Sequence, residues 1–207
     1  MPSSREVRDA FHQQLYGHFL GTFWLGVLAV KNPMDLMVYQ EILFELRPEL
    51  IIETGTFMGG SALFLASVCD LLGQGRVISV DVKPAPALPA HPRITYIQGD
   101  SCSPEVLDLV NAERVEARSA MVILDSDHSR DHVLRELRAY SPMVSVGQYL
   151  ITEDTNVNGH PVLPEHGPGP WEAVGEFLKG QDAFAIDVAR EKFLLSFNPG
   201  GYLLRVK

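Results

Sequence analysis

Short apolar runs of strand type alternate with segments of helical periodicity along most of the chain. Between two such runs, Leu65, Val68, Cys69 and Leu72 recur at the spacing of one helix face. Strands joined through helices need crossover connections, so the alternation predicts an α/β protein with a mostly parallel sheet. The expected strands are Glu49–Thr54, Arg76–Val82, Arg93–Ile97, Ala120–Asp125 and Tyr149–Thr152.

The two ends of the chain depart from this alternation. Near the C-terminus, Phe193–Phe197 and Tyr202–Val206 flank Asn198-Pro199-Gly200-Gly201, which is typical of a tight turn. The pattern predicts a reversal that adds at least one antiparallel strand. The part up to Leu46 indicates helices before the first strand, with a break around Asn32-Pro33. We expect one domain over residues 1–207, with an N-terminal helical segment (1–47) and an α/β core (48–207).

Charge and composition argue against several classes of function. The 207 residues include 17 Lys and Arg against 26 Asp and Glu, a formal charge of -9, so nucleic-acid binding has no support from clustered basic residues. Two cysteines make no disulfide framework. The most apolar early run, Phe19 to Val30, is about half as long as a bilayer-spanning helix, and no basic region directly precedes it. We expect a cytoplasmic protein with no membrane or nucleic-acid partner; homo-oligomer formation stays open.

Polar residues at the strand ends predict a ligand pocket, because ligands of open parallel sheets bind beyond the carboxyl ends of the strands. The first strand ends at Glu53 and enters a glycine-rich turn that opens a helix. The run from Gly55 lacks the second glycine of G-x-G-x-x-G, and Glu53 suits a cationic amino group better than a phosphate. Asp81 can accept both hydroxyls of a ribose, and Gly99-Asp100-Ser101 is expected to meet an adenine edge. The predicted cofactor-binding residues are Glu53, Gly55, Thr56, Gly59, Ser61, Asp81, Asp100, Ser101 and Asp125.

Three carboxylates follow neighbouring strands: Asp125 ends the fourth, and Glu153 and Asp154 follow the fifth. Together they would repel one another unless a cation or protons intervened. Hard oxygen ligands fit Mg²⁺ better than Zn²⁺, and acids that are merely solvated are the alternative. His128 follows Asp125 by three residues and is predicted to act as a general base or to cap the next helix. Its i, i+4 spacing to His132 is by itself a weak indication of zinc.

Several spaced motifs resemble those of the cephalosporin hydroxylase family. They extend over nearly the whole chain, and the resemblance rests on their combination. The motifs are Trp24-Leu25-Gly26, Lys31-Asn32-Pro33-Met34-Asp35, Tyr39-Gln40-Glu41-Ile42, Ile51-Ile52-Glu53-Thr54-Gly55-Thr56, Gly59-Gly60-Ser61, Asp125-Ser126-Asp127-His128, Glu153-Asp154-Thr155, Arg190-Glu191-Lys192-Phe193 and Asn198-Pro199-Gly200-Gly201-Tyr202.

The resemblance implies a Rossmann-like class I methyltransferase fold, with a mostly parallel seven-stranded sheet, a C-terminal antiparallel strand and N-terminal helices. It implies an S-adenosylmethionine-dependent O-methyltransferase acting on a small-molecule hydroxyl, such as that of a sugar or another diol in natural product biosynthesis. In the macrolide deoxysugar O-methyltransferases that it resembles, Mg²⁺ is held by an Asp and a Glu-Asp pair, which match Asp125, Glu153 and Asp154. Their proposed base matches His128.

Two other functions remain open. The family label implies an oxygenase, whose iron would need two histidines and a carboxylate, drawn from Asp125, His128 and a distant histidine. The other is a non-catalytic protein that binds S-adenosylmethionine without magnesium. In the methyltransferase, the long loop from Asn156 to Pro170, with Trp171 behind it, is expected to be a lid that excludes water and selects the acceptor.

Overall fold

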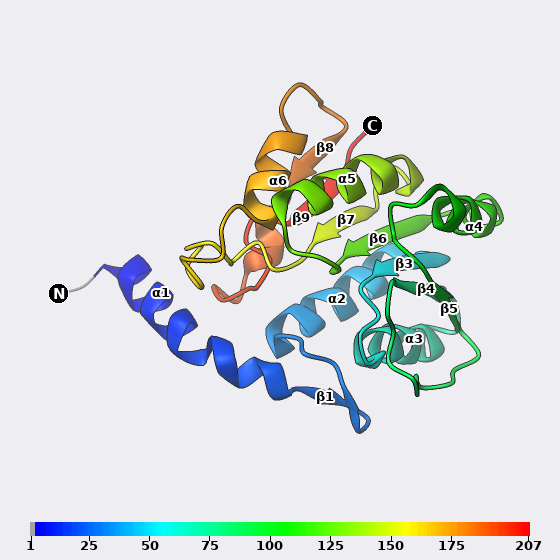
Figure 1. Ribbon diagram of the computed structural model, residues 1–207, viewed down its shortest axis with the longest axis horizontal. Helices are drawn as coiled ribbons and strands as arrows, with labels where there is room; N and C mark the ends of the chain where they lie inside the picture. The colour runs from blue at the N-terminus through cyan, green and yellow to red at the C-terminus, as the bar shows by residue number, and fades with distance from the viewer. Residues whose placement is uncertain (1–2) are drawn as a thin grey trace.

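A seven-stranded sheet forms the centre of the computed structural model, which describes residues 3–207 (Figure 1). Its strand order is β5-β4-β3-β6-β7-β9-β8; β9 pairs antiparallel with both β7 and β8, and the other neighbouring strands pair in parallel. The expected α/β fold with a C-terminal antiparallel strand is confirmed. The strands are β3 (Leu50–Thr54), β4 (Arg76–Asp81), β5 (Ile94–Gln98), β6 (Ala120–Leu124), β7 (Tyr149–Thr152), β8 (Phe184–Ile186) and β9 (Tyr202–Arg205).

Helices cover both faces of the sheet (Figure 1). Every residue of β3, β6 and β7 is buried, as expected for central strands packed on both sides. Alternate side chains of β3 enter different cores: Leu50 and Ile52 pack with α4, α5 and α6, whereas Ile51 packs with α2 and α3. The helices are α2 (Pro33–Leu46), α3 (Gly60–Leu72), α4 (Pro104–Val115), α5 (Arg130–Tyr140) and α6 (Pro170–Phe177), with short 3-10 turns η2 (Ser141–Met143) and η3 (Val188–Glu191).

The N-terminal part is only partly helical. Helix α1 (Ser4–Leu15) and the 3-10 turn η1 (Tyr16–Gly21) precede a small hairpin, β1 (Phe23–Trp24) and β2 (Val27–Leu28), which the sequence pattern did not predict. The Trp24 indole donates a hydrogen bond of 3.1 Å to Ser67 Oγ and fastens the hairpin to α3. The predicted break at Asn32-Pro33 is the start of α2, where the Asn32 side chain caps the helix and Pro33 occupies its first turn.

The chain reverses before β9 as predicted, but Phe193–Phe197 does not pair with β9. The partner of β9 is β8, about ten residues earlier in the chain. Residues 193–197 cannot form a regular strand because Leu194 has φ +64°. The following residues instead bond to α2: Ser196 Oγ and the Phe197 amide donate to the Asp35 carboxylate at 2.7 and 2.8 Å.

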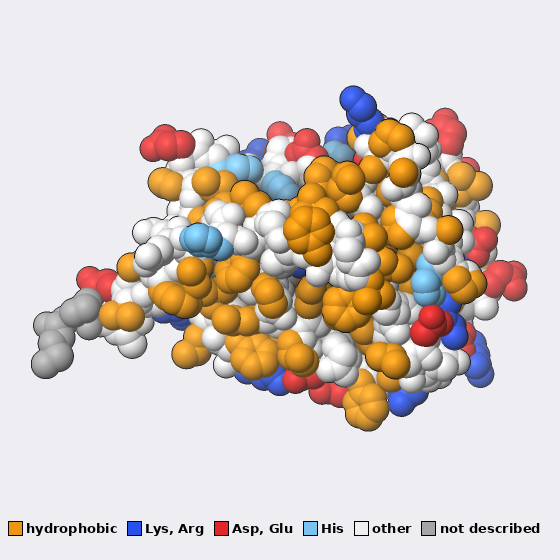
Figure 2. Space-filling model, turned by 90° about the horizontal axis from the view of Figure 1, so that it is seen from below, with side chains coloured by type: hydrophobic (Ala, Val, Ile, Leu, Met, Phe, Trp, Pro, Cys, Tyr) orange, Lys and Arg blue, Asp and Glu red, His pale blue; other side chains and the backbone are white. Residues whose placement is uncertain are grey.

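Apolar side chains gather on the side of the molecule formed by the N-terminal elements (Figure 2). They include Phe11 of α1, Phe23 and Leu25 of the hairpin, and Met37 and Phe44 of α2, all exposed. Among the helices of residues 3–207, none combines the length and the apolar character that crossing a bilayer requires.

Two glycines differ in how closely other atoms pack around them. A Cβ atom at Gly201 would lie 2.2 Å from the Thr152 carbonyl oxygen, whereas a Cβ at Gly175, inside α6, would meet nothing within 4 Å. We expect Gly201→Ala to lower the free energy of unfolding by about 1–3 kcal/mol through overpacking. Gly175→Ala should instead raise it by about 0.5–1 kcal/mol, because alanine is the better helix former. Urea unfolding of both variants checks this; equal midpoints would contradict the packing described here.

Candidate active site

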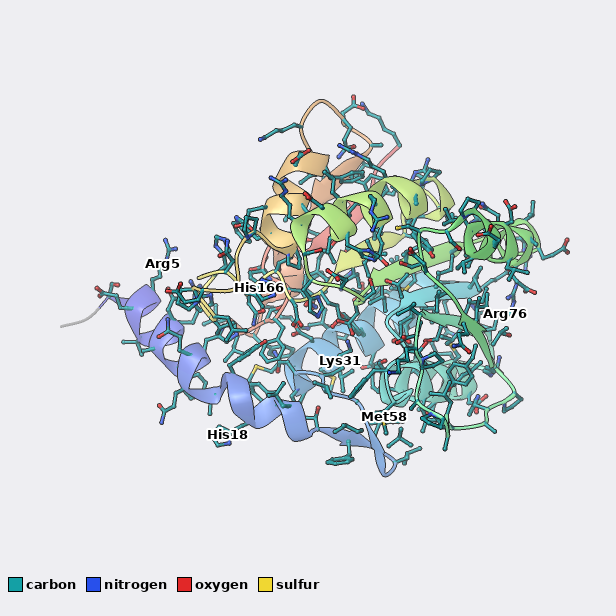
Figure 3. The ribbon with its side chains drawn as sticks, in the orientation of Figure 1. Arg5, His18, Lys31, Met58, Arg76 and His166 are labelled. Atoms are coloured by element: carbon teal, nitrogen blue, oxygen red, sulfur yellow. The ribbon has the colours of Figure 1, made fainter. Side chains whose placement is uncertain are left out.

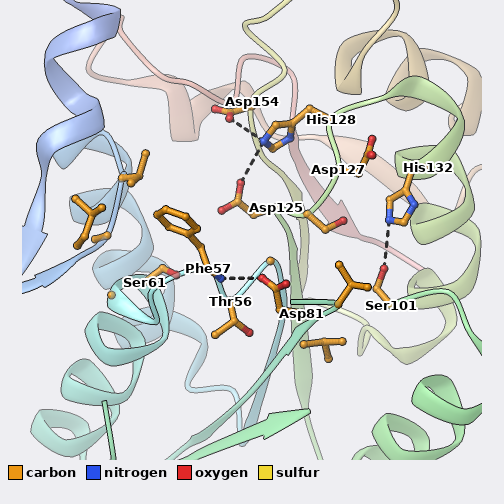
Figure 4. A pocket seen from close by; sticks show the side chains of 18 of the residues that line it. Thr56, Phe57, Ser61, Asp81, Ser101, Asp125, Asp127, His128, His132 and Asp154 are labelled. Atoms are coloured by element: carbon orange, nitrogen blue, oxygen red, sulfur yellow. Dashed lines mark hydrogen bonds and ion pairs between the residues drawn. The ribbon is translucent and has the colours of Figure 1, made fainter. Parts of the chain in front are cut away.

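A pocket of about 830 Å³ opens beyond the carboxyl ends of the strands, where the sequence pattern predicted it. Figure 4 shows Asp154, His128 and Asp125 at one end and Ser101 and His132 at the other, with Asp81 lower down between them. Of the predicted cofactor-binding residues, those that line the pocket are Gly55, Thr56, Ser61, Asp81, Asp100, Ser101 and Asp125.

The turn after β3 forms one wall of the pocket, and glycine is required there. Gly55 has φ +90°, and a Cβ atom on it would lie 1.8 Å from the Asp125 carbonyl oxygen of the neighbouring strand end. The turn is also tied to β4, since the Phe57 amide donates to Asp81 Oδ2 at 2.8 Å. The Lys83 amide donates to the other oxygen, Asp81 Oδ1, at 2.7 Å, so both oxygens hold the carboxylate in place at the pocket surface.

Two predicted cofactor-binding residues lie beside the pocket rather than on its surface. Gly59 is the N-cap of α3 and takes the left-handed conformation, with φ +80°. Glu53 is buried, accepts a hydrogen bond of 2.6 Å from Ser79, and through it contacts Thr56. Burial raises the pKa of Glu53 to about 7. Its position beneath the turn suits a role in shaping the pocket wall.

The acids at the ends of β6 and β7 do meet, and a lysine lies between two of them. The Lys31 ammonium donates to Asp125 and, at 2.7 Å, to Glu153 Oε2. Burial alone would lower the pKa of Lys31, but the charges of Asp125 and Glu153 outweigh it and raise that pKa above its ordinary value. Figure 3 shows Lys31 in the interior, whereas His18 points away from the molecule.

His128 lies on the other side of the same acids. Its Nε2 is 3.2 Å from Asp154 Oδ2 and 4.0 Å from Asp125 Oδ1. Burial raises the pKa of Asp125, Glu153 and Asp154 above their ordinary values, as expected for like charges in a desolvated site. The site therefore stabilises positive charge.

The donor set fits a hard divalent cation. Atoms of Asp125, His128 and Asp154 that can act as ligands all lie within 4.8 Å of one another. Carboxylate oxygens that are partly desolvated and open to a pocket are ligands that Mg²⁺ accepts while it keeps water or substrate oxygens. Glu153, the third predicted ligand, is adjacent, but its two oxygens are engaged by Lys31 and by the Tyr39 hydroxyl at 2.7 and 2.8 Å.

A buried network positions Glu153 from behind. The Asn198 amide donates to Tyr39 Oη at 2.8 Å, and Tyr39 donates to Glu153. Asp35, one helical turn before Tyr39 in α2, accepts bonds from Ser196, Phe197 and Tyr202, and burial raises its pKa to about 6. The N-terminal helix α2 and the C-terminal turn thus jointly hold the acid at the end of β7.

Sequence reasoning assigned no role to Lys31 or Tyr39. Both lie in motifs that carried the family resemblance, but motif membership does not say what a side chain contacts. One available signal for Lys31 was its place directly after the apolar residues 27–30, because a lysine buried next to an acidic pocket needs a carboxylate partner.

The histidine pair does not form a zinc site with shared ligands. His132 Nε2 lies 3.4 Å from Glu136 and 3.3 Å from Ser101 Oγ, at the opposite end of the pocket from His128 (Figure 4). Within residues 3–207, each cluster able to hold a cation contains one histidine. The two-histidine iron set of the oxygenase alternative is therefore not assembled in the part of the chain that is described.

The predicted lid is a loop between β7 and α6 that is fastened at both sides. Asn156 contacts His12 of α1 at 3.0 Å, and burial lowers the pKa of His12 to about 4. His160 bonds to Glu172 at 2.9 Å and stacks on Trp171, with ring centroids 4.7 Å apart. A second pocket of about 430 Å³ lies among α1, this loop and residues 191–199.

Comparison with known proteins identifies the family. Residues 17–206 match the family model described as Rhamnosyl O-methyltransferase/CmcI. A rhamnosyl O-methyltransferase of Mycobacterium leprae is 40% identical over 207 residues, covering 96% of this chain and 90% of the relative. The rhamnosyl O-methyltransferase of Mycobacterium tuberculosis is 36% identical over 214 residues, covering 98% and 86% of the two chains.

Solved structures agree with the fold. An apo structure of CmcI superposes with a TM-score of 0.69 at 25% identity, over 90% of this chain and 76% of that one. A structure of MycE from the mycinamycin pathway, in complex with Mg, SAH and mycinamycin VI, has a TM-score of 0.51 at 20% identity, over 79% and 44% of the chains. A CmcI structure with Mg and SAM has a TM-score of 0.66 at 24% identity, over 90% of this chain and 77% of that one. The chain belongs to the Rhamnosyl O-methyltransferase/CmcI family of S-adenosylmethionine-dependent O-methyltransferases.

Proposed function

We propose that this protein transfers the methyl group of S-adenosylmethionine to a sugar hydroxyl, with Mg²⁺ bound at the ends of β6 and β7. The observation that carries the proposal is the convergence of Asp125, His128 and Asp154 at the edge of a pocket large enough for the cofactor. The names of the curated relatives support a rhamnosyl or similar deoxysugar acceptor. A sugar diol also suits a metal with open positions, because two vicinal oxygens can chelate it.

Asp125, Glu153 and Asp154 would hold the ion. When bound, Mg²⁺ supplies a Lewis acid that lowers the pKa of the acceptor hydroxyl, and the sulfonium cofactor supplies an electrophilic methyl group. Glu153 can ligate the ion directly only if the Lys31 ammonium moves, because this ammonium donates to Glu153 Oε2 and to Asp125. The three carboxylates offset the charge of the cation, which leaves the site able to accept a neutral diol.

His128 is the proposed general base. Its Nε2 faces Asp154 and Asp125, and its side chain lines the pocket in which the acceptor hydroxyl would bind. Asp154 would orient the ring and stabilise the imidazolium that forms when the proton arrives. The loop from Asn156 to Pro170 would cover the acceptor and exclude water, with the stacked His160–Trp171 pair holding it in place.

Asp154→Asn tests the cation site. Asp154 has φ +53°, a conformation that asparagine also tolerates, so the backbone should keep its shape. We expect at least about tenfold weaker Mn²⁺ binding by electron paramagnetic resonance, because the site loses one ligand charge. Methyl transfer in wild-type protein should stop with EDTA and return with Mg²⁺. Undiminished Mn²⁺ affinity in the variant would remove Asp154 from the ligand set.

His128→Gln separates base catalysis from binding. Loss of a general base should lower kcat by about 10²- to 10⁴-fold. The dissociation constant of S-adenosylmethionine should stay within about twofold, because the side chain faces the acids rather than the cofactor turn. His18→Gln, at an exposed position of η1, is the matched control and should match wild type. Equal losses of turnover and cofactor affinity would assign His128 a structural role.

Lys31→Met tests whether this ammonium compensates the acids when no metal is bound. Removing one partner of a buried ion pair costs about 3–5 kcal/mol, so without metal the melting temperature should fall by roughly 6 °C or more. Saturating Mg²⁺ should then raise it further than in wild type, because the cation replaces the lost charge and meets no competing ammonium. Lys192→Met, which breaks an exposed pair with Glu41, is the control. An Mg²⁺ gain equal to that of wild type would show that Lys31 and the ion do not share these ligands.

A further inference from the structure

A buried carboxylate without an assigned role lies behind the end of the pocket opposite the acidic site. Glu136 of α5 is 0% exposed, and its Oε1 accepts hydrogen bonds from Ser101 Oγ at 2.5 Å and Ser126 Oγ at 2.7 Å. Its Oε2 is buried and has no hydrogen-bond partner within residues 3–207. Both serines line the pocket. A desolvated carboxylate costs stability, so its retention against two pocket hydroxyls points to a task at the ligand.

One face of α5 supports this end of the pocket. His132, Glu136 and Tyr140 follow one another at intervals of four residues, which places them on the same side of the helix. All three contact the loop after β5 at Ser101: His132 and Glu136 at its hydroxyl, and Tyr140, whose hydroxyl donates to the Ser101 carbonyl at 2.7 Å. The loop therefore has a fixed position as well as a fixed hydroxyl.

The hydrogen bonds fix which way each hydrogen points. An ionised carboxylate only accepts, and each serine has one hydroxyl hydrogen, so Ser101 and Ser126 direct theirs at Glu136 and keep oxygen lone pairs for the pocket. Arg135 donates to His132 Nδ1 at 2.9 Å, which leaves the hydrogen on Nε2, and that atom faces Ser101 and Glu136. Asp100 and Asp127 also line the pocket and offer carboxylate acceptors.

A pocket end that offers acceptors selects a ligand that offers donors. Asp81, the expected ribose contact, lies between this end and the acidic site, so the purine of a bound nucleoside would reach Ser101 and Ser126. Adenine carries an exocyclic amino group with two hydrogens at position 6, whereas a 6-oxo purine carries an acceptor oxygen there. The latter would face the lone pairs of both serines, and a site built for hydrogen bonding rejects such a mismatch strongly.

We propose that Glu136 is a specificity-determining positioning residue, which turns the hydroxyl hydrogens of Ser101 and Ser126 away from the pocket so that their oxygens accept the amino group of adenine and reject a 6-oxo purine. The proposal rests on the proposed use of an adenosyl cofactor. It adds that adenine selection depends on a side chain that does not itself line the pocket.

Titration calorimetry with S-adenosylhomocysteine and S-inosylhomocysteine tests this. Wild-type protein should prefer the adenosyl ligand by at least about 100-fold. In Glu136→Leu, neither serine keeps an acceptor behind the pocket, so both hydroxyl hydrogens are free to turn toward the ligand. The preference should then fall by at least about tenfold, as a ratio of dissociation constants that general destabilisation would not change. Glu116→Leu, the same substitution at an exposed site, should keep the wild-type ratio.

Ser126→Ala provides a second variant, which removes one acceptor and leaves Glu136 in place; its preference should also fall. A wild-type preference retained in both folded variants would overturn the proposal, as would equal binding of the two ligands by wild type. If wild type bound neither ligand, the proposed function and this inference would both be wrong. If wild type bound both ligands equally, only the inference would be wrong, so the two results are distinguishable.

Discussion

The ion pairs of Lys31 with Asp125 and Glu153 are the interaction on which the acidic site depends. The ends of adjacent parallel strands bring carboxylates together whether or not this is favourable, and burial then raises the pKa of each. A cation between the carboxylates attracts each of them and offsets their mutual repulsion. The chain supplies one such cation itself, from Lys31 just before the N-cap of α2, and leaves Asp154 and His128 facing the pocket for another.

Charge and hydrogen-bond direction determine what each end of the pocket can bind. At the acidic end, carboxylates accept from Lys31 and Tyr39 and attract cations. At the other end, Glu136 uses its charge to orient hydroxyls rather than to meet the ligand. The acid at each end depends on a helix packed on the sheet: Tyr39 of α2 donates to Glu153 on one face, and α5 itself carries Glu136 on the other.

Much of the fold was predictable, because period and polarity along the chain report directly on strands, crossovers and strand ends. The parallel strands, the antiparallel β9 and the pocket-lining residues from Gly55 to Asp125 followed from such local patterns. Phe193–Phe197 does not pair with β9, because the left-handed backbone at Leu194 and the hydrogen bonds to Asp35 override the local strand preference. No role was assigned to Lys31 or Glu136 because each acts through a residue distant in sequence. Lys31 bonds to Asp125, more than 90 residues away, and Glu136 bonds to Ser101, about 35 residues away.

The proposed chemistry depends on a divalent cation bound by Asp125 and Asp154 beside the cofactor pocket. The most direct measurement is an anomalous difference map from a crystal grown with Mn²⁺ and S-adenosylhomocysteine. The account predicts one strong peak at about 2.0–2.4 Å from a carboxylate oxygen of each residue, with Lys31 Nζ displaced from its place between Asp125 and Glu153. A fully occupied cofactor with no peak at these oxygens, and Lys31 still in place, would contradict it.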